Sequence, residues 1–329
     1  MSETFLYWGD FIHTLLLFLL FSLGLFLIIR GGDRFVDAAA WMASASGIPP
    51  FVIGATVVSV ATTLPEILVS VTAALRGQAD MAAGNAIGSV TANTALIMAL
   101  SILFVPCAVD RSRFLPKALV LIAAILLLWL SGLSGWLTPV GSMGLFILLI
   151  VFVYENLHTA RSEPSPVVDD VDIDRGMIIK NILFFFLGAG EIVLGSRLLV
   201  DNGALIARDV FRIDERVISL TMLAVGTSLP ELVTAVSAIV KRQPAITAGN
   251  ILGANTIDML LILPLCALMQ GGALPLSRST VWIDLPFCLL ATLITVVPAL
   301  VKKRFFRWQG VCSIGLYIIY TVFLFVKDA

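Results

Sequence analysis

The stretch Thr62-Thr63-Leu64-Pro65-Glu66 is repeated as Thr227-Ser228-Leu229-Pro230-Glu231. Each copy places a carboxylate and a proline inside a long apolar segment. On insertion scales an ionisable side chain at the bilayer centre costs about 2.5 to 3.5 kcal/mol, and such residues usually mark an ion or substrate path. The repeated motif therefore predicts a functional site within a membrane.

Composition supports a membrane environment. Of 329 residues, 59% are hydrophobic and 13% are charged, against roughly 25% charged in soluble domains. The mean hydropathy is +1.02. The 21 basic residues are scattered along a chain of net charge -1, which argues against a nucleic-acid partner. We expect a polytopic protein whose partner is the lipid bilayer.

The chain shows none of the usual signs of an enzyme. It has no nucleophile, histidine or metal motif. Its four cysteines lack the C-x-x-C spacing of metal and redox sites, so they are predicted to be thiols packed among helices. We therefore expect a protein that is not an enzyme and holds no cofactor.

Ten apolar segments are long enough to cross a bilayer as helices, which takes about 20 residues. The predicted fold is an all-α membrane protein with spans at 11–30, 50–76, 80–106, 115–134, 138–156, 178–199, 215–241, 245–270, 280–300 and 308–327. Two further segments, 35–47 and 201–213, are too short to cross and are predicted to lie at the interface or to form half-helices. A polar linker, 157–177, separates the first half, 1–156, from the second, 178–329.

The two halves are copies of one another. Positions 52–100 align with positions 217–265 without a gap and agree at 19 of 49 places. A repeat with an odd number of spans enters the membrane from the opposite side in its second copy, as in many secondary transporters. The sequence therefore predicts two inverted five-helix repeats, with the site near the midplane between them.

Basic residues predict the orientation. The odd-numbered connections hold fourteen Lys and Arg residues, and the even-numbered connections and termini hold seven. Because basic loops stay in the cytoplasm, both termini are predicted to lie outside the plasma (inner) membrane. The linker 157–177 is then cytoplasmic.

The repeated motifs supply oxygen atoms to one place. Thr62 and Glu66 are four positions apart and so share a helical face. Pro65 lacks an amide hydrogen and clashes with the carbonyl four positions earlier, which frees backbone oxygens near 60–62. The next span of each repeat adds a polar stripe at every fourth position: Asn85, Ser89 and Asn93 in the first, and Asn250, Ala254 and Asp258 in the second.

This donor set suits a hard cation. Calcium takes six to eight oxygen ligands, and the absence of nitrogen and sulfur donors argues against zinc or copper. The acids could neutralise one divalent ion, or two or three monovalent ions at other times, so competition for shared carboxylates is a basis for exchange. The candidate ligands are Thr62, Thr63, Glu66, Ser89, Asn93, Thr227, Ser228, Glu231 and Asp258.

With two T-[ST]-L-P-E motifs, each followed at the same spacing from its glutamate by Asn93 or Asp258, the chain resembles the calcium/cation antiporter superfamily and is similar to its prokaryotic sodium/calcium exchangers. The resemblance covers essentially the whole chain. It implies the sodium/calcium exchanger fold, with alpha repeats at about 50–106 and 215–270. It also implies a secondary active antiporter that exports calcium against inward sodium flow by alternating access, with the first and sixth helices sliding past the motif-bearing bundle. We expect a functional monomer.

The resemblance also implies ligand roles. Glu66 and Glu231 match the central calcium ligands, and Thr62 and Thr227 match residues that give main-chain oxygen to calcium and oxygens to sodium. Both ions are cargo. The sites are completed by Ser89, Asn93, Asp258, Thr63, Ser228 and the carbonyls of Ser59 and Ala224.

Some motif positions depart from the family pattern. Ala61 replaces a glycine, Val90 replaces an asparagine, and Ala254 replaces a serine whose hydroxyl helps one sodium site in the family. Asp258 matches an aspartate of the potassium-dependent branch. The alternatives are a proton/calcium exchanger, a potassium-dependent sodium/calcium exchanger and, more remotely, a cation channel, although a channel does not need inverted halves around one shared site.

Overall fold

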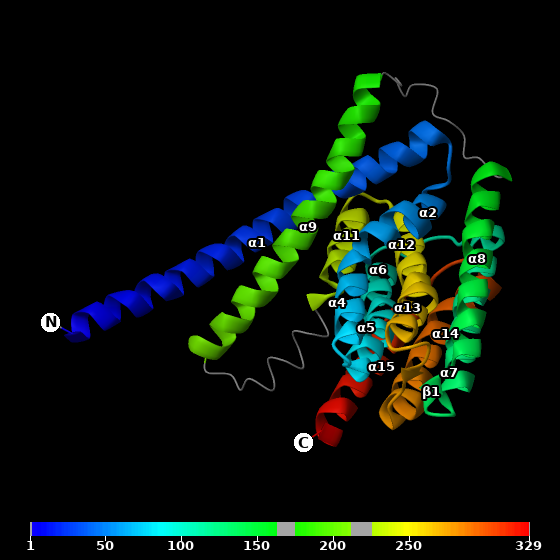
Figure 1. The fold of residues 1–329 in the computed structure, drawn as a ribbon. Coiled ribbons are helices and arrows are strands. Elements are labelled where there is room, and N and C mark those ends of the chain that lie inside the picture. The colour runs from blue at the N-terminus through cyan, green and yellow to red at the C-terminus, as the bar shows by residue number, and fades with distance from the viewer. Residues whose placement is uncertain (1, 163–174, 212–225, 329) are drawn as a thin grey trace.

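The computed structural model describes residues 2–162, 175–211 and 226–328, which form an almost entirely helical bundle with two long helices at its side (Figure 1). The predicted span 215–241 is therefore described only in part, and most of the linker 157–177 lies outside the described residues. The first half contains α1 (Ser2–Ser46), α2 (Pro50–Ile53), η1 (Gly54–Val58), α3 (Ser59–Thr62), α4 (Leu64–Leu75), α5 (Ala79–Ala92), η2 (Asn93–Met98), α6 (Ala99–Phe104), α7 (Arg111–Gly132), β1 (Trp136–Leu137) and α8 (Pro139–Ser162).

The second half repeats much of this order. It contains α9 (Arg175–Asp209), α11 (Leu229–Val240), α12 (Pro244–Ile257), η3 (Asp258–Ile262), α13 (Leu263–Met269), β2 (Leu274–Pro275), η4 (Thr280–Asp284), α14 (Leu285–Lys302) and α15 (Arg307–Asp328). In the alignment of 52–100 with 217–265, both ends of α11 coincide with those of α4, and both ends of α12 coincide with those of α5. The helix ends thus follow the same register as the sequence repeat.

Membrane-crossing helices account for most of the predicted spans. Within the described residues, seven helices are long and apolar enough to cross, and an eighth is obtained if the bent pair Pro50–Thr62 and Leu64–Leu75 counts as one span. α11 is too short to be counted, because most of the segment before it lies outside the described residues. α15 covers the tenth predicted span, 308–327, but is not among the seven helices. The protein is an integral membrane protein, and the count of ten spans stays a prediction.

The expectation for 35–47 and 201–213 is wrong in one respect. Neither segment is separate: α1 runs without a break to Ser46, and α9 runs to Asp209. A helix satisfies its own backbone hydrogen bonds, so the polar residues around Asp33 do not interrupt it. At 1.5 Å per residue α1 is about 68 Å long, so it must tilt or extend beyond a core of ~30 Å.

The two long helices lie against each other at the side of the bundle (Figure 1). Their most apolar windows are only 17% buried, whereas those of the helices Ala79–Phe104 and Pro244–Met269 are 72% and 83% buried. Arg34 of α1 forms an ion pair with Glu191 of α9, and Phe35 stacks on Phe185 with ring centroids 4.5 Å apart. α1 and α9 therefore contact each other far more than they contact the bundle.

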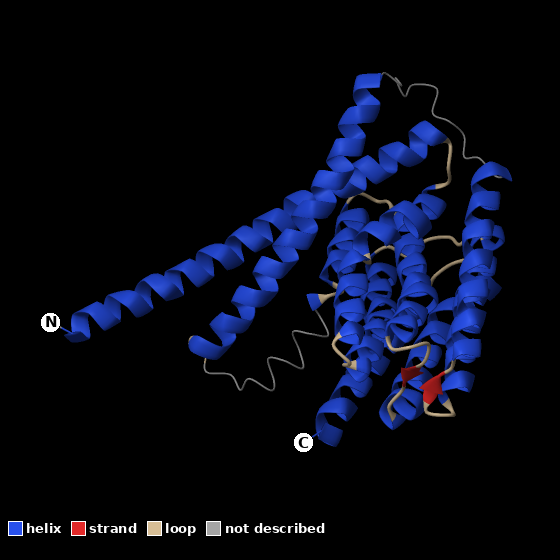
Figure 2. Cartoon of the chain, in the orientation of Figure 1, coloured by secondary structure: helices blue, strands red, loops and turns tan. Residues whose placement is uncertain are grey.

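Short contacts between connecting segments and helix ends close the bundle. β1 and β2 form a short antiparallel pair, shown in red in Figure 2.

In α14, Pro298 has no amide to donate to the carbonyl of Ile294. The Gln309 side chain of α15 donates to that oxygen at 3.1 Å and to the carbonyl oxygen of Thr295 at 2.8 Å. A buried amide therefore replaces the hydrogen bond that the proline removes.

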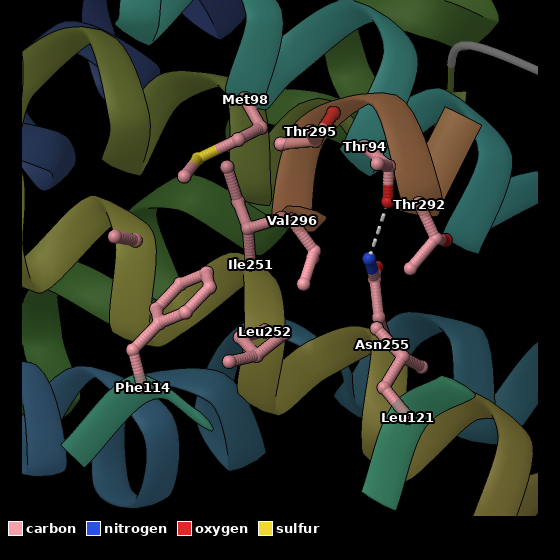
Figure 3. Close-up of a pocket in the computed structure, with 11 residues that line it drawn as sticks. Thr94, Met98, Phe114, Leu121, Ile251, Leu252, Asn255, Thr292, Thr295 and Val296 are labelled. Atoms are coloured by element: carbon pink, nitrogen blue, oxygen red, sulfur yellow. Dashed lines mark hydrogen bonds between the residues drawn. The ribbon is translucent and has the colours of Figure 1, made fainter. Parts of the chain in front are cut away.

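A small pocket lies between η2, α7, α12 and α14 (Figure 3). Much of its wall is apolar, including Met98, Phe114, Ile251 and Val296. Its polar side chains are those of Thr94, Asn255, Thr292 and Thr295, so the lining offers a divalent cation no carboxylate.

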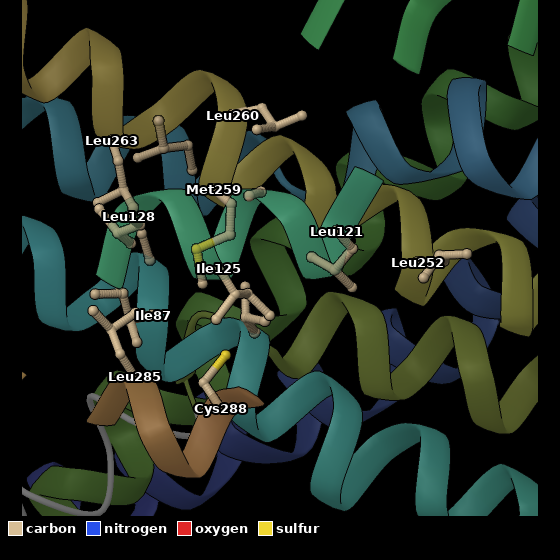
Figure 4. Packing of buried hydrophobic residues seen from close by; sticks show 14 of the residues in the cluster. Ile87, Leu121, Ile125, Leu128, Leu252, Met259, Leu260, Leu263, Leu285 and Cys288 are labelled. Carbon is tan, nitrogen blue, oxygen red and sulfur yellow. The ribbon is translucent and has the colours of Figure 1, made fainter. Parts of the chain in front are cut away.

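The main hydrophobic core lies between α5, α7, η3 and α14 (Figure 4). Ile87, Ile125, Met259 and Leu285 are fully buried in it. Filling this layer with apolar side chains fixes α5 and α12, and so the polar residues at their ends, within the centre of the bundle.

Candidate cation site

Two helix breaks carry the repeated motif. α3 ends at Thr62, α4 begins at Leu64, and the axis bends by 46° between them. Pro65 causes the break, because it cannot donate to the carbonyl of Ala61. The helix dipole and free amides at the start of α4 favour negative charge, and Glu66 lies in its first turn. The sequence prediction of a broken helix at this proline is confirmed.

The second copy has the same local geometry where it is described. Ser228 precedes α11, which begins at Leu229 with Pro230 next, and Glu231 lies in the first turn. Each half thus presents one glutamate at the start of a half-helix. Thr227 is half-buried, and Ala224 lies outside the described residues.

Two more of the predicted ligands begin π-helical segments. Asn93 is the first residue of η2, and Asp258 is the first residue of η3. A π-helical turn is rare and occurs frequently at functional sites, because it widens the helix and disturbs its hydrogen bonding. Sequence spacing predicted the residues but not this local conformation.

Most of the candidate side chains are buried, and many of their oxygens have no hydrogen-bond partner among the described residues. Thr63, Glu66, Asn93, Glu231 and Asp258 are each at most 1% exposed. Among the described residues, ten oxygen atoms of the predicted ligand set are buried without a hydrogen-bond partner: Thr63 Oγ1, Glu66 Oε1 and Oε2, Ser89 Oγ, Asn93 Oδ1, Ser228 Oγ, Glu231 Oε1 and Oε2, and Asp258 Oδ1 and Oδ2. Leaving such groups buried and unpaired is costly, so a ligand is expected to contact them.

The structure brings the acids of the two halves together. Glu66 lies within electrostatic range of Glu231 and Asp258, and Asp258 lies within range of Glu231. The side chains of Thr62 and Thr63 lie beside the Glu231 carboxylate. Within the described part of the chain, however, no three His, Cys, Asp or Glu side chains are arranged as a ready-made metal cluster. Any cation bound here would therefore need hydroxyl, amide or carbonyl oxygens besides carboxylates.

Glycines let the second half press against the first. A Cβ on Gly249 would collide with the carbonyl oxygen of Phe51, and one on Gly253 would lie 2.6 Å from that of Ala55. α12 can therefore approach α2 and η1 at backbone distance, as expected for small residues between membrane helices. This contact brings the residues of α12 next to the break in the other repeat.

Some predicted oxygens are already engaged in this conformation. The Ser59 carbonyl accepts from the Thr63 amide at 2.9 Å and from the Thr62 hydroxyl at 3.3 Å. The Thr62 hydroxyl is also 3.1 Å from Asn250 Oδ1. These bonds use only the hydroxyl hydrogen of Thr62, so the lone pairs of its oxygen stay available to a cation. The Ser59 carbonyl already accepts two hydrogen bonds and would have to lose one of them to bind a cation.

Three asparagines near the site tie helices together. Asn85 donates to Ser70 Oγ at 2.9 Å and to the Glu66 carbonyl at 3.4 Å, so it ties α5 to α4. Asn250 joins α12 to Thr62. Asn255 bonds Thr94 in the other half. The sequence signal for such links is an amide side chain in an apolar span, because an amide inside a membrane helix needs a hydrogen-bond partner.

A family model described as "Sodium/calcium exchanger protein" matches residues 16–155 and 180–326. The chain belongs to the sodium/calcium exchanger family. The resemblance inferred from the repeated motif is thereby confirmed, and so is the expectation of a transporter rather than an enzyme.

Individual relatives of this exchanger cover most of its length. Inner membrane protein YrbG of Escherichia coli is 35% identical over 269 residues, which is 79% of this chain and 82% of that protein. The sodium/calcium exchanger MaX1 of Methanosarcina acetivorans is 27% identical over 346 residues, covering 94% and 98% of the two chains. The family description and the name of MaX1 support cation exchange, with calcium among the ions, as the activity of the family.

Solved structures of the exchanger NCX_Mj share the fold of this exchanger. One, soaked with sodium and strontium ions, superposes with a TM-score of 0.81 at 28% identity and covers 93% of this chain and 98% of the other. The exchanger fold is therefore shown.

Proposed function

We propose that this protein exchanges calcium for sodium across the membrane by alternating access, through one site shared by the two halves. The observation that carries this proposal is the set of ten buried, unpartnered oxygens on Thr63, Glu66, Ser89, Asn93, Ser228, Glu231 and Asp258. Hard cations bind through such oxygens. A relative named as a sodium/calcium exchanger and the sodium and strontium soaks of NCX_Mj support the choice of ions.

Competition for the same carboxylates couples the two ions. Glu66, Glu231 and Asp258 together carry up to three negative charges, and separating them from water makes an unneutralised state costly. A calcium ion, or two or three sodium ions, would offset these charges. Because either load uses the same oxygens, binding of one ion displaces the other.

The placement of α1 and α9 supports alternating access. Both helices lie at the side of the bundle, pack mainly on each other, and touch the bundle near α2, α3 and α11. We infer that they slide against the bundle and open the site to each side in turn. Inverted halves, termini outside the plasma membrane, a cytoplasmic 157–177 linker and function as a monomer complete the proposed arrangement.

Flux into proteoliposomes tests this function. Vesicles preloaded with sodium, potassium, choline or a proton gradient are given external calcium-45, and uptake is compared between them. Sodium-loaded vesicles should accumulate calcium, and choline-loaded vesicles should not. Calcium uptake into choline-loaded vesicles would indicate a channel. Calcium uptake driven only by a proton gradient would identify protons, not sodium, as the counter-ion.

Asp258 favours a second candidate, a potassium-dependent exchanger. The chain also matches human sodium/potassium/calcium exchanger 3 at 26% identity over 163 residues, about half of this chain and a quarter of that protein. In this case calcium uptake into sodium-loaded vesicles should need potassium beside the calcium. Replacing external potassium with choline distinguishes the two candidates.

A further inference from the structure

A buried side-chain hydrogen bond, in addition to the one between Thr62 and Asn250, connects the halves beside the proposed site. Asn255 Nδ2 of α12 donates to Thr94 Oγ1 of η2 at 2.7 Å, as the dashed line in Figure 3 shows. Asn255 is 1% exposed and Thr94 is 4% exposed. The bond joins residues 161 positions apart in the sequence.

Both partners are neighbours of proposed ligands. Thr94 directly follows Asn93 at the start of η2, and Asn255 lies one helical turn before Asp258. In a helix, residues three apart lie on the same side. The bond therefore lies at the level where the Asn93 amide and the Asp258 carboxylate enter the site.

Asn93 needs such support. Neither atom of its side-chain amide has a hydrogen-bond partner, so the side chain is not held by bonds of its own. The π-helical turn that carries it has weaker geometry than an α-helix. If η2 shifted by one residue, Asn93 would rotate by about 100° around the helix axis. A bond from the adjacent Thr94 to α12 opposes this shift, because the shift would break it.

The bond is absent from the equivalent place in the other half. In the alignment of the two halves, Asn255 corresponds to Val90 and Thr94 corresponds to Met259, and these side chains cannot form it. The link is therefore not a general feature of the repeat.

We propose that Asn255 and Thr94 are positioning residues, which hold Asn93 and Asp258 at the separation that calcium binding requires. The inference rests on the proposed function, because it concerns how that site is held. Neither residue is assigned as an ion ligand. Losing the bond should weaken calcium binding while the transport cycle itself continues.

Calcium-45 uptake into sodium-loaded proteoliposomes, measured over a range of calcium concentrations, tests the inference. Thr94→Val and Asn255→Val should each raise the half-saturating calcium concentration about three- to ten-fold, the range expected for one hydrogen bond, with little change in maximal rate. Thr94→Ser keeps the hydroxyl and should restore the wild-type value. The double variant should show the same shift as either single variant, because both remove one bond.

Thr256→Val is the matched control. Thr256 is buried next to Asn255, and its hydroxyl donates only within α12, to the Leu252 carbonyl at 2.7 Å. Its half-saturating calcium concentration should equal the wild-type value. Equal half-saturating calcium concentrations for Thr94→Val and wild type, or additive shifts in the double variant, would overturn the positioning role of this bond. The proposed function would still stand. Absent wild-type flux would overturn the proposed function and this inference with it.

Discussion

Gly188 of α9 and Gly31 of α1 meet backbone to backbone. A Cβ on Gly188 would lie 2.8 Å from the Gly31 carbonyl oxygen, and a Cβ on Gly31 would lie 2.8 Å from the Gly188 carbonyl oxygen. Gly24 and Gly195 form a second contact of this kind, about two helical turns away on each helix. These contacts let the two long helices pack at backbone distance.

Gly188→Ala should separate α1 from α9. The added Cβ meets backbone atoms that cannot rotate away, and overpacking of this kind costs about 1 to 3 kcal/mol. We expect a lower thermal unfolding temperature in detergent and slower exchange in proteoliposomes. Gly190→Ala on the same helix is the control, since nothing lies within 4 Å of its Cβ. Gly190 should tolerate alanine, which raises helix propensity by about 1 kcal/mol; equal behaviour of the two variants would contradict the close contact.

Glu66→Gln and Glu231→Gln should each reduce calcium uptake to the background of empty vesicles. Each change keeps the size of a fully buried side chain and removes one charge that a divalent ion needs. Size-exclusion chromatography should show folded protein in both cases. Asp80→Asn, at the exposed start of α5, should transport normally. Calcium uptake that persists in both glutamine variants would refute the site assignment.

Ala254→Ser should strengthen the dependence on sodium. Ala254 is fully buried in α12, four positions before Asp258, and occupies the position that corresponds to Ser89. A hydroxyl there adds one oxygen for a monovalent ion. The half-saturating sodium concentration for calcium release should fall, while Ala83→Ser, also fully buried but in α5, should leave it unchanged. An unaltered sodium response in Ala254→Ser would disconnect this position from sodium binding.

Gln309→Leu should destabilise the last two helices. It leaves the carbonyls of Ile294 and Thr295 without the buried amide that now donates to them. An unsatisfied buried acceptor costs about 1 to 3 kcal/mol, so the thermal unfolding temperature should drop. Gln78→Leu is the control, because Gln78 is exposed and makes no side-chain cap on α5. If both variants unfold at the wild-type temperature, the Gln309 amide does not stabilise α14 at Pro298.

Local features of the fold could be predicted when their cause is local. Pro65 lacks an amide wherever it is placed, so the break before α4 followed from the sequence. The continuity of α1 through Asp33 did not follow from the sequence. Polar residues suggest a segment at the membrane interface, whereas helix continuity depends on backbone hydrogen bonds and on packing against α9. The partner of Glu191 was also out of reach, since Arg34 is 157 residues away.

The sequence by itself determined that the chain lies in a membrane, that it contains two copies of one unit, and that each copy offers hydroxyl, amide and carboxylate oxygens beside a broken helix. Composition, repeat register and spacing are properties of the chain in one dimension. Only the tertiary structure decided which oxygens remain unpartnered. Asn250, 188 residues from Thr62, engages the hydroxyl of Thr62, whereas the carboxylate oxygens of Glu66, Glu231 and Asp258 are buried without a hydrogen-bond partner among the described residues. Helix packing sets these pairings, because they join residues that are far apart in the chain.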